Sequence, residues 1–312
     1  MTDPVNQFPV RVLAVIVLYK LKPSECVTLD SLQAAKINLA PGQANIEILL
    51  YDNTPGGQGI GLLPANIRYK ADLKNGGLAE AYNYALKIAC DEGFDWLLTL
   101  DQDTHLPGDF LGKLCDSAVF VASSRSIAAI VPCVSSDKRV MSPWIPTKHW
   151  ALVRRFPDGF IGIPSQKVYA ANSASTMRVK ALGEVGGYDP RFRLDFSDLV
   201  MYYRLQCNNF RVFVAGNIRV EHELSGFDLR GRSSPERYIE FHAAEEAFYD
   251  EYLSNRSGLV LLLRMLYRLI YRLWSQGGSL PYFRVTLRFF CRRLFCSRNH
   301  RRKTRSVLFN IA

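Results

Sequence analysis

The sequence predicts an α/β protein with a mostly parallel central sheet flanked by helices, followed by a basic, amphipathic helical extension. Three observations predict this fold class. Strand-like and helix-like segments alternate through the N-terminal part, acidic side chains follow strand-like segments, and basic residues are concentrated near the C-terminal end. A chain of 312 residues with 48% hydrophobic content can bury a sizeable core, which argues against disorder.

The predicted elements follow one another in βα order. The β-branched run from Val10 to Tyr19 is typical of a strand that is covered on both faces. A helical stretch covers about 24–37, and a second strand ends at Asp52 and Asn53. The segment "AEAYNYALKIACDEG" favours a helix, and "DWLLTL" and "SIAAIVPCV" are predicted strands. In such sheets ligands bind at the carboxyl ends of the strands.

Charge divides the chain into two parts. Thirteen of the 39 Lys and Arg residues follow Tyr252, and none of the 29 Asp and Glu residues does. The chain before Tyr252 is therefore slightly acidic, with 26 basic and 29 acidic residues, and need not bind polyanions. We predict a domain over 1–254, with halves that meet near residue 135, and a helical tail over 255–312.

The N-terminus and the cysteines predict a cytoplasmic protein. The first apolar run has no basic region before it and no small-residue cleavage pattern, so it is interpreted as a strand rather than a signal peptide. The seven cysteines are odd in number and form no C-x-x-C pair. This pattern favours free thiols in a reducing compartment over a disulfide framework or a zinc site.

The stretch "DWLLTLDQDTHLP" places Asp101 and Asp103 directly after an apolar run. Residues two apart in a strand point the same way, so both carboxylates could face one ligand. Two such carboxylates repel each other unless they share a cation, and their oxygens suit Mg²⁺ or Mn²⁺, which commonly also bind phosphates. The alternative is a solvated loop in which Asp103 caps a turn before Pro107.

Two further stretches carry polar groups at predicted element ends. Asp52 could accept hydrogen bonds from a nucleobase or a ribose hydroxyl, although Asp-Asn before Pro-Gly is also ordinary turn chemistry. Asn75, Gly76 and Gly77 open a helix whose N-terminal amides could bind an anion, or could simply be capped. Neither stretch matches a dinucleotide fingerprint, and the lysine of a P-loop is absent from the sequence.

The stretch "RFRLDFSDLVMYYRLQ" offers two carboxylates, which could supply a general base if a cleft lies beside them. Asp195 and Asp198 lie three apart at the expected start of a helix, where an acid can also serve as a cap. Asp198 is the better base, because the periodic apolar helix after it would hold it rigidly. His222, which follows the strand-like "RVFVAGNIRV", is structural if it acts alone, and a ligand if carboxylates and phosphates need one more.

Taken together and in this order, these stretches resemble the family-2 glycosyltransferases, which have the GT-A fold with a Rossmann-like sheet. The resemblance runs from about Val10 to about Gly226 and rests on the ordered set "VIVLYK", "YDN", "NGGLAEAYNYAL", "LDQDT", "GGYDPRFRLDFSD" and "EHELSG". "LLTLDQDT" with "FRLDFSD" looks most like the bacterial rhamnosyltransferase branch. Many members have Glu-Asp where this chain has Ser197-Asp198, which leaves the substrate preference of that corner open.

The resemblance implies an inverting transferase. Its first half, to about residue 135, would bind a dTDP or UDP sugar, and the branch it resembles points to rhamnose as that sugar. Its second half, 136–254, would bind a glycan or lipid-linked acceptor of bacterial surface polysaccharide synthesis. The implied site residues are Asp52 for the base, Asn75 near the nucleotide, Asp101 for the ribose side, Asp103 and His222 for Mg²⁺ or Mn²⁺ on the diphosphate, and Asp198 as the catalytic base.

Two other functions compete with this interpretation. A nucleotidyltransferase is expected to have a glycine-rich, basic loop after the first strand, where this chain has "YKLKPSEC". A non-catalytic protein that binds nucleic acid or membrane through its tail would leave the ordered acidic motifs unexplained. We therefore expect no nucleic-acid partner.

The tail predicts a helix at the membrane surface. Arg264, Arg268 and Arg272 lie four apart in "LVLLLRMLYRLIYRLW", which is too short and too charged to span a bilayer. In an interfacial helix, Leu, Tyr and Trp would enter the headgroup boundary while the arginines meet anionic lipid. We expect residues 259–305 to bind the cytoplasmic face of the inner membrane. The alternative is a helix packed on the domain with its arginines in solvent.

Overall fold

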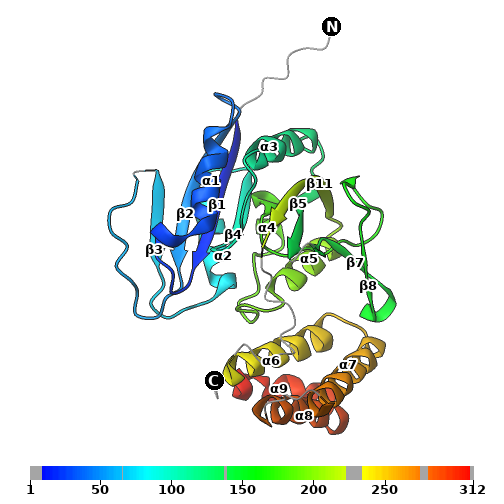
Figure 1. The fold of residues 1–312 in the computed structure, drawn as a ribbon. Helices are drawn as coiled ribbons and strands as arrows, with labels where there is room; N and C mark the ends of the chain where they lie inside the picture. Colours follow the sequence, from blue (N-terminus) through cyan, green and yellow to red (C-terminus); the bar gives the residue numbers. More distant parts are fainter. Residues whose placement is uncertain (1–8, 65, 137–138, 223–233, 275–279, 310–312) are drawn as a thin grey trace. The chain divides into compact units, whose positions relative to one another are not determined.

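The computed structural model describes residues 9–64, 66–136, 139–222, 234–274 and 280–309 (Figure 1). The chain forms two compact units. We call Met1–Ile145 with Arg155–Leu224 the sheet unit, and Pro146–Arg154 with Ser225–Ala312 the helical unit. The division falls near residue 224 rather than at the predicted residue 254, because helix α6 (Pro235–Glu251) packs with the helices that follow it.

The sheet unit is built on a nine-stranded sheet with the order β3-β2-β1-β4-β10-β5-β11-β9, in which β6 pairs with β5. The strands β3, β2, β1, β4, β5 and β11 run in one direction, and β10 lies antiparallel between β4 and β5. The predicted α/β class with a mostly parallel sheet is therefore confirmed. The strands are β1 (Val10–Leu18), β2 (Ala44–Asp52), β3 (Ile67–Ala71), β4 (Trp96–Asp101), β5 (Ile127–Ser136), β6 (Arg139–Ser142), β9 (Ile161–Gly162), β10 (Ser175–Arg178) and β11 (Arg211–Glu221), with β7 (Trp144–Pro146) and β8 (Val153–Arg155) in a separate pair.

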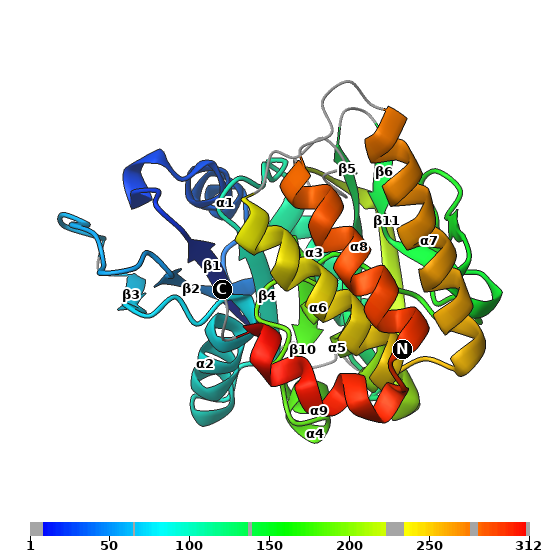
Figure 2. The same ribbon diagram turned by 90° about the horizontal axis from the view of Figure 1, so that it is seen from below.

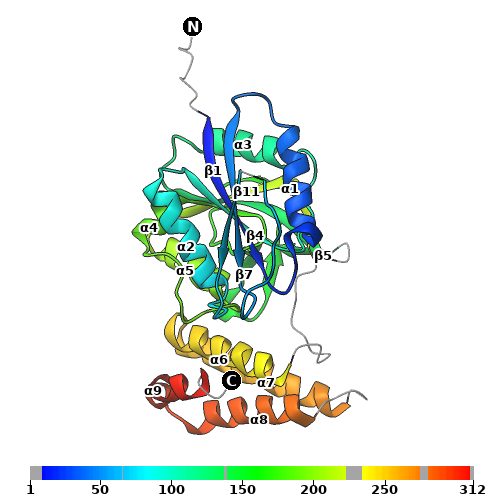
Figure 3. The ribbon, with the colours of Figure 1, turned by 90° about the vertical axis from the view of Figure 1, so that its left-hand side faces the viewer.

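Helices cover both faces of the sheet, as the continuous apolar run of β1 requires. Alternate residues of β1 point to opposite faces, and Ile16 packs in one cluster with Leu32 and Phe110. Figure 3 shows α1 and α3 on one face and α2, α4 and α5 on the other. These helices are α1 (Val27–Ile37), α2 (Leu78–Asp91), α3 (Phe110–Phe120), α4 (Val179–Glu184) and α5 (Ser197–Cys207), with 3-10 turns at Pro23–Glu25 and Lys148–Trp150.

The register of the strands brings several predicted site residues to one edge of the sheet. Leu18, at the end of β1, lies opposite Asp52, and Val17 lies opposite Asp101. The end of β11 reaches the same edge, because His105 exchanges backbone hydrogen bonds with Glu221 at 2.9 and 3.3 Å. Carboxylates that are far apart in sequence therefore meet where parallel strands end.

The helical unit contains α6 together with α7 (Asn255–Trp274), α8 (Leu280–Phe295) and α9 (Arg298–Phe309). Figure 2 shows α7 and α8 side by side, and α6 packs against both of them and against α9. Helix α7 carries Arg264, Arg268 and Arg272, and α8 carries a second series at the same spacing, Arg284, Arg288 and Arg292. Within the described ranges, no helix is both long enough and apolar enough to cross a bilayer.

The arginines of α7 point into the helical unit, so the prediction that they meet lipid is wrong. Arg268 is 2% exposed and donates two hydrogen bonds to Glu245, at 2.5 and 2.7 Å. Arg272 lies over the rings of Tyr238 and Tyr282, 5.0 and 4.9 Å from their centroids. Arg264 donates to the Tyr249 hydroxyl at 2.7 Å. Only Arg268 is paired with a carboxylate among these contacts, whereas Arg264 and Arg272 contact tyrosines. The alternative prediction, that the arginines lie in solvent, is wrong as well, because Arg268 and Arg272 are buried and Arg264 is partly buried.

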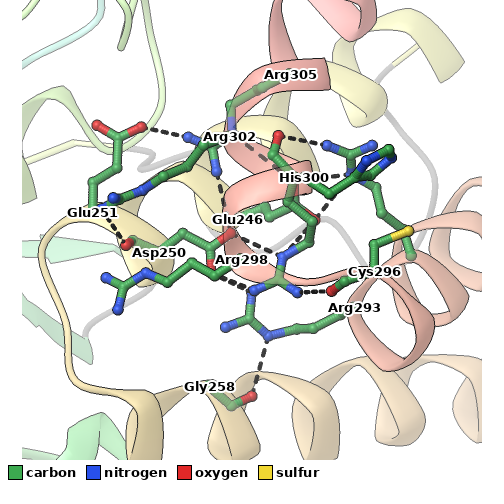
Figure 4. A network of polar contacts seen from close by, with 12 residues as sticks. Glu246, Asp250, Glu251, Gly258, Arg293, Cys296, Arg298, His300, Arg302 and Arg305 are labelled. Carbon is green, nitrogen blue, oxygen red and sulfur yellow. Dashed lines mark hydrogen bonds and ion pairs between the residues drawn. The ribbon is translucent and has the colours of Figure 1, made fainter.

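A second ionic network ties α6 to α8 and α9 (Figure 4). Asp250 is 1% exposed and pairs with Arg293 at 3.2 Å, Arg301 at 2.7 Å and Arg305 at 3.2 Å. Despite burial, these arginines lower the pKa of Asp250. Glu246, which is fully buried, pairs with Arg292 at 3.1 Å. The core of the helical unit is therefore held by charge as well as by apolar packing.

Candidate active site

The two aspartates of "LDQDT" lie on either side of a tight turn. Asp101 is the last residue of β4 and Asp103 follows in the turn, so both lie at the strand end as expected, but the alternation of a strand does not set their relative direction. Thr28, in the first turn of α1, holds this turn. Its hydroxyl accepts from the Thr104 amide at 2.8 Å and donates to the carbonyl oxygens of Asp101 and Thr104, at 2.6 and 2.9 Å. The turn is thus fixed from α1.

Asp101 lies at the inner side of the site. Its carboxylate accepts a short hydrogen bond from the hydroxyl of Ser173, which precedes β10. Burial raises the pKa of Asp101, while the nearby His222 and Ser173 act in the opposite direction. Ser173 was not predicted from the sequence, because a single serine outside a motif gives no signal.

His222 lies directly after β11 and contacts both aspartates. Its Nε2 is 3.5 Å from Asp101 Oδ2, and its Nδ1 is 3.2 Å from Asp103 Oδ1. Thr104 Oγ1 is 3.3 Å from the same Nδ1. Although burial opposes it, the two carboxylates raise the pKa of His222, and the histidine in turn lowers the pKa of Asp103 despite burial. The rest of the "EHELSG" motif, 223–226, lies outside the described residues.

The donor atoms of this cluster suit a hard divalent cation. Asp101 and Asp103 supply carboxylate oxygens, and His222 supplies an imidazole, a donor set that Mn²⁺ and Mg²⁺ accept. Among the described residues, however, no group of three or more His, Cys, Asp or Glu side chains is arranged so that it could hold a metal ion. Mg²⁺-type sites commonly use one or two carboxylates and take their remaining ligands from substrate phosphates and water. The cluster fits that mode.

Asp198 lies in the first turn of α5, after Phe196, which has a left-handed backbone with φ of 64°. The residue preceding α5 makes no side-chain cap, and Asp198 Oδ1 accepts from the Leu199 amide at 2.7 Å. Burial, together with the charges of Asp195 and Asp101, raises the pKa of Asp198 to about 7. A carboxylate of that pKa is well matched to accept a proton near neutral pH.

A buried polar contact fixes the start of α5 and was also not predicted. The side-chain amide of Asn172 donates to the hydroxyl of Ser197 at 3.1 Å, and the backbone carbonyl of Asn172 accepts from the hydroxyl of Thr99 at 2.7 Å. Ser197 is 3% exposed. Ser197, the residue that departs from the Glu-Asp pattern, is therefore linked through Asn172 to Thr99 of β4. This link fixes the start of α5, where the neighbouring Asp198 lies.

Asp52 is placed at the predicted edge but is completely buried. Its two oxygens accept from the Thr54 amide at 2.9 Å and from the Tyr69 hydroxyl at 2.6 Å. Direct contact with a nucleobase therefore requires Tyr69 or the chain at Thr54 to move. The adjacent Asn53 is 3% exposed, and its Oδ1 has no hydrogen-bond partner among the described residues. A ligand donor would satisfy such an atom.

The start of α2 is capped rather than open to an anion. The amides of Leu78 and Ala79 donate to the Arg193 carbonyl at 2.6 and 3.3 Å. Gly77 has φ of +89°, and a Cβ there would lie 2.4 Å from the same carbonyl, so glycine is required. The Asn75 carbonyl accepts from the Arg193 guanidinium at 2.5 Å. Of the two sequence interpretations, the structure therefore supports the cap.

Comparison with known proteins identifies the fold. No family model matches the chain, and no curated protein matches it by sequence. GalNAc-T7, solved with UDP, GalNAc and Mn²⁺, aligns with a TM-score of 0.55 at 14% identity, covering 93% of this chain and 56% of that one. S. aureus TarS 1–349, solved with UDP and with UDP-GlcNAc, aligns with a TM-score of 0.53 at 15% identity, covering 96% of this chain and 86% of that one. This chain thus spans just over half the length of GalNAc-T7. At such identity the likeness shows the fold alone, which is the predicted GT-A fold.

Proposed function

We propose that this protein is a glycosyltransferase that moves a sugar from a nucleoside diphosphate to an acceptor hydroxyl. The observation that carries the proposal is the meeting of Asp101, Asp103 and His222 at the carboxyl edge of a GT-A sheet. The solved neighbours that contain UDP or UDP-GlcNAc support the same class of donor. Asp198 supplies a carboxylate whose pKa lies near neutrality.

The acidic cluster is proposed to bind the diphosphate end of the donor. Asp103 and His222 would hold Mg²⁺ or Mn²⁺, and Asp101 would bind the ribose side. The cation would supply positive charge to the departing diphosphate. On the protein side, Ser173 and Thr104 orient Asp101 and His222 through the hydrogen bonds already described, so the cluster is set before substrate arrives.

Asp198 is proposed to act as the general base. Its carboxylate would take the proton of the acceptor hydroxyl as that oxygen forms a bond to the anomeric carbon and the bond to the diphosphate breaks. Attack from the face opposite the leaving group inverts the configuration in one displacement. Asn172 and Ser197 act by holding the start of α5, so they are positioning residues.

The substrates are proposed from chemistry and from resemblance together. The donor is a UDP or dTDP sugar, with rhamnose as the first sugar to test, and Asn53 and Asn75 lie on the segments proposed to surround the nucleotide. The acceptor is a glycan or lipid-linked sugar of bacterial surface polysaccharide synthesis, reached from the cytoplasmic face of the inner membrane.

A donor panel tests this proposal. We expect UDP or dTDP sugars to raise the Tm of the full chain when Mn²⁺ is present, and mass spectrometry to detect released nucleotide once the acceptor is added. Asp103→Asn and His222→Ala should abolish the metal-dependent shift, whereas Asp91→Asn, in an exposed ion pair, should keep it. Normal turnover in EDTA would refute the metal role, and an absence of binding to any nucleotide sugar would refute the function.

A further inference from the structure

The exposed side of α7 is apolar. A surface helix normally turns its apolar residues to the core and its charges to water, but here Arg268 and Arg272 are buried. Trp274 is 86% exposed and Leu273 is 69% exposed. We call this the apolar face of α7, and its residues are Leu259, Leu263, Tyr267, Ile270, Leu273 and Trp274.

The ionic network keeps this face outward. Turning α7 to bury its apolar residues would take Arg268 away from Glu245, which is 1% exposed. A buried carboxylate left without its partner is strongly destabilising. Arg264, whose guanidinium also reaches the Trp150 carbonyl at 2.6 Å, would be displaced as well. The exposure is therefore a consequence of how α6 fixes the arginines, and the helix cannot rotate to remove it at low cost.

The neighbouring helix adds positive charge beside the apolar face. On α8, which packs against α7, Arg284 and Arg288 are exposed next to Leu280 and Leu287. The sequence from Tyr252 onward contains no acidic residue. A ligand for this surface must therefore offer an apolar region for the exposed apolar side chains and negative charge for the arginines.

An anionic lipid surface satisfies both conditions, whereas a second copy of the chain does not. Symmetric pairing of two such surfaces would oppose the same positive charges across the contact. Tyr267 and Trp274 are the residue types that gather at the headgroup boundary, with apolar side chains beside them. Charge complementarity thus selects the membrane as the occupant.

We infer that the apolar face of α7, flanked by Arg284 and Arg288, docks this protein on anionic membranes by inserting its apolar and aromatic side chains. The buried arginines of α7 take no part in lipid contact and serve to hold the face outward. This inference goes beyond the transfer reaction, and vesicle binding can be measured without any donor or acceptor.

Vesicle co-sedimentation with the full chain tests the inference. We expect binding to phosphatidylcholine vesicles that contain about a third phosphatidylglycerol, and weaker binding to pure phosphatidylcholine. Leu263→Glu with Trp274→Glu should lower binding by roughly tenfold or more, because two inserted side chains are lost. Arg284→Gln with Arg288→Gln should lower it by roughly fivefold for each arginine and reduce its dependence on salt.

Control variants separate docking from folding. Ile37→Glu places a charge on an equally accessible apolar side chain, 83% exposed at the end of α1, and should bind as the wild type does. Trp274→Gln, at the last residue of α7, repeats the test should the double variant fail to fold. Equal vesicle binding by wild type and the folded α7 variants would overturn the inference. So would a dimer in analytical ultracentrifugation that Leu263→Glu dissociates, because a second copy would then cover the face.

Discussion

The two units of the molecule differ in how many basic side chains pair with their buried and partly buried carboxylates. In the helical unit, Asp250 is 1% exposed and meets three guanidinium groups. In the sheet unit, the one basic side chain that pairs with Asp101 and Asp103 within the described ranges is His222, and the side chain of Asp103 is 57% exposed. The pKa of Asp198 is raised by burial and by the charges of Asp195 and Asp101.

This difference separates structural charge from functional charge. A carboxylate that is fully matched by arginines has nothing left to offer a ligand, and it contributes to the core. A carboxylate cluster with too little positive charge stores repulsion that a cation or a proton can relieve. The contrast supports the proposal that the chemistry lies at the strand ends, whereas the carboxylates of α6 have a structural role, even though both regions are acidic.

The largest expected effect comes from breaking the matched network. Asp250→Ala leaves Arg293, Arg301 and Arg305 without their shared carboxylate, and we expect it to destabilise the helical unit by about 3–5 kcal/mol. Hydrogen exchange of the α6–α9 amides in the full chain measures this loss. Asp91→Ala, which removes an exposed ion pair with Lys87, should leave the protection of these amides unchanged, because solvent screens that pair. Similar protection in both variants would contradict the comparison.

Removing the unmatched base should have the opposite effect on stability. Asp198→Asn is expected to lower the transfer rate by about a hundredfold to a thousandfold, because the hydroxyl proton loses its acceptor. The pKa of Asp198 is raised from 3.8 to about 7, so its contribution to folding is most favourable at low pH and is lost as pH rises toward 7. Above pH 7, Asp198→Asn should therefore raise Tm by a few degrees. A variant with lower Tm and normal turnover would remove Asp198 from the site.

The same pKa predicts the pH dependence of the reaction. A base works only when ionised, so kcat/KM should fall about tenfold for each pH unit below 7 and level off above it. A pH series of initial rates at saturating Mn²⁺ measures this fall in kcat/KM below pH 7. The residual activity of Asp198→Asn should not show the fall. A limb centred near pH 4 in the wild type would show that Asp198 is not the titrating group.

The smallest expected effect sharpens the role of a supporting residue. Ser173→Ala removes the hydrogen bond to Asp101, and we expect the affinity for the donor nucleotide to fall about fivefold, with little change in Tm. Calorimetric titration with UDP and Mn²⁺ measures the change. Ser124→Ala, whose hydroxyl pairs only with exposed Ser126 among the contacts described, is the matched control. Unchanged affinity in Ser173→Ala would reduce the serine to a structural role.

Much of the fold and the centre of the site follow from local sequence. Apolar runs of strand length, separated by helical segments, predict the sheet, and parallel strands bring their ends to one edge. The family resemblance implied that Asp103 and His222 lie close together, and Asp103 Oδ1 is 3.2 Å from His222 Nδ1. Their supports were not expected, because Thr28 and Ser173 contact the turn across 73 and 72 residues and belong to no motif.

The helical unit shows a different limit of sequence reasoning. A spacing of four places Arg264, Arg268 and Arg272 on one face of a helix, but it does not say which face turns inward. That choice depends on Glu245, which lies on another helix and is itself buried. An acidic helix followed by helices without acids was a usable signal, because opposite charges in separate helices favour pairing. The predicted domain boundary at residue 254 was placed by charge alone. It therefore assigned the acidic helix α6 to the first domain, although α6 packs with the basic helices that follow it.

The backbone pairing of His105 with Glu221 has a consequence for synthesis. It joins the segment that follows β4 to the end of β11. The contact between Thr104 and His222 spans 118 residues of the sequence. Chains emerge from the ribosome at about 5–20 residues per second and fold from the N-terminal end. The growing chain therefore carries Asp101 and Asp103 for many seconds before its histidine exists. A ribosome-bound chain that stops before β11 still lacks His222, and we expect such a chain to show no metal-dependent binding of a nucleotide sugar.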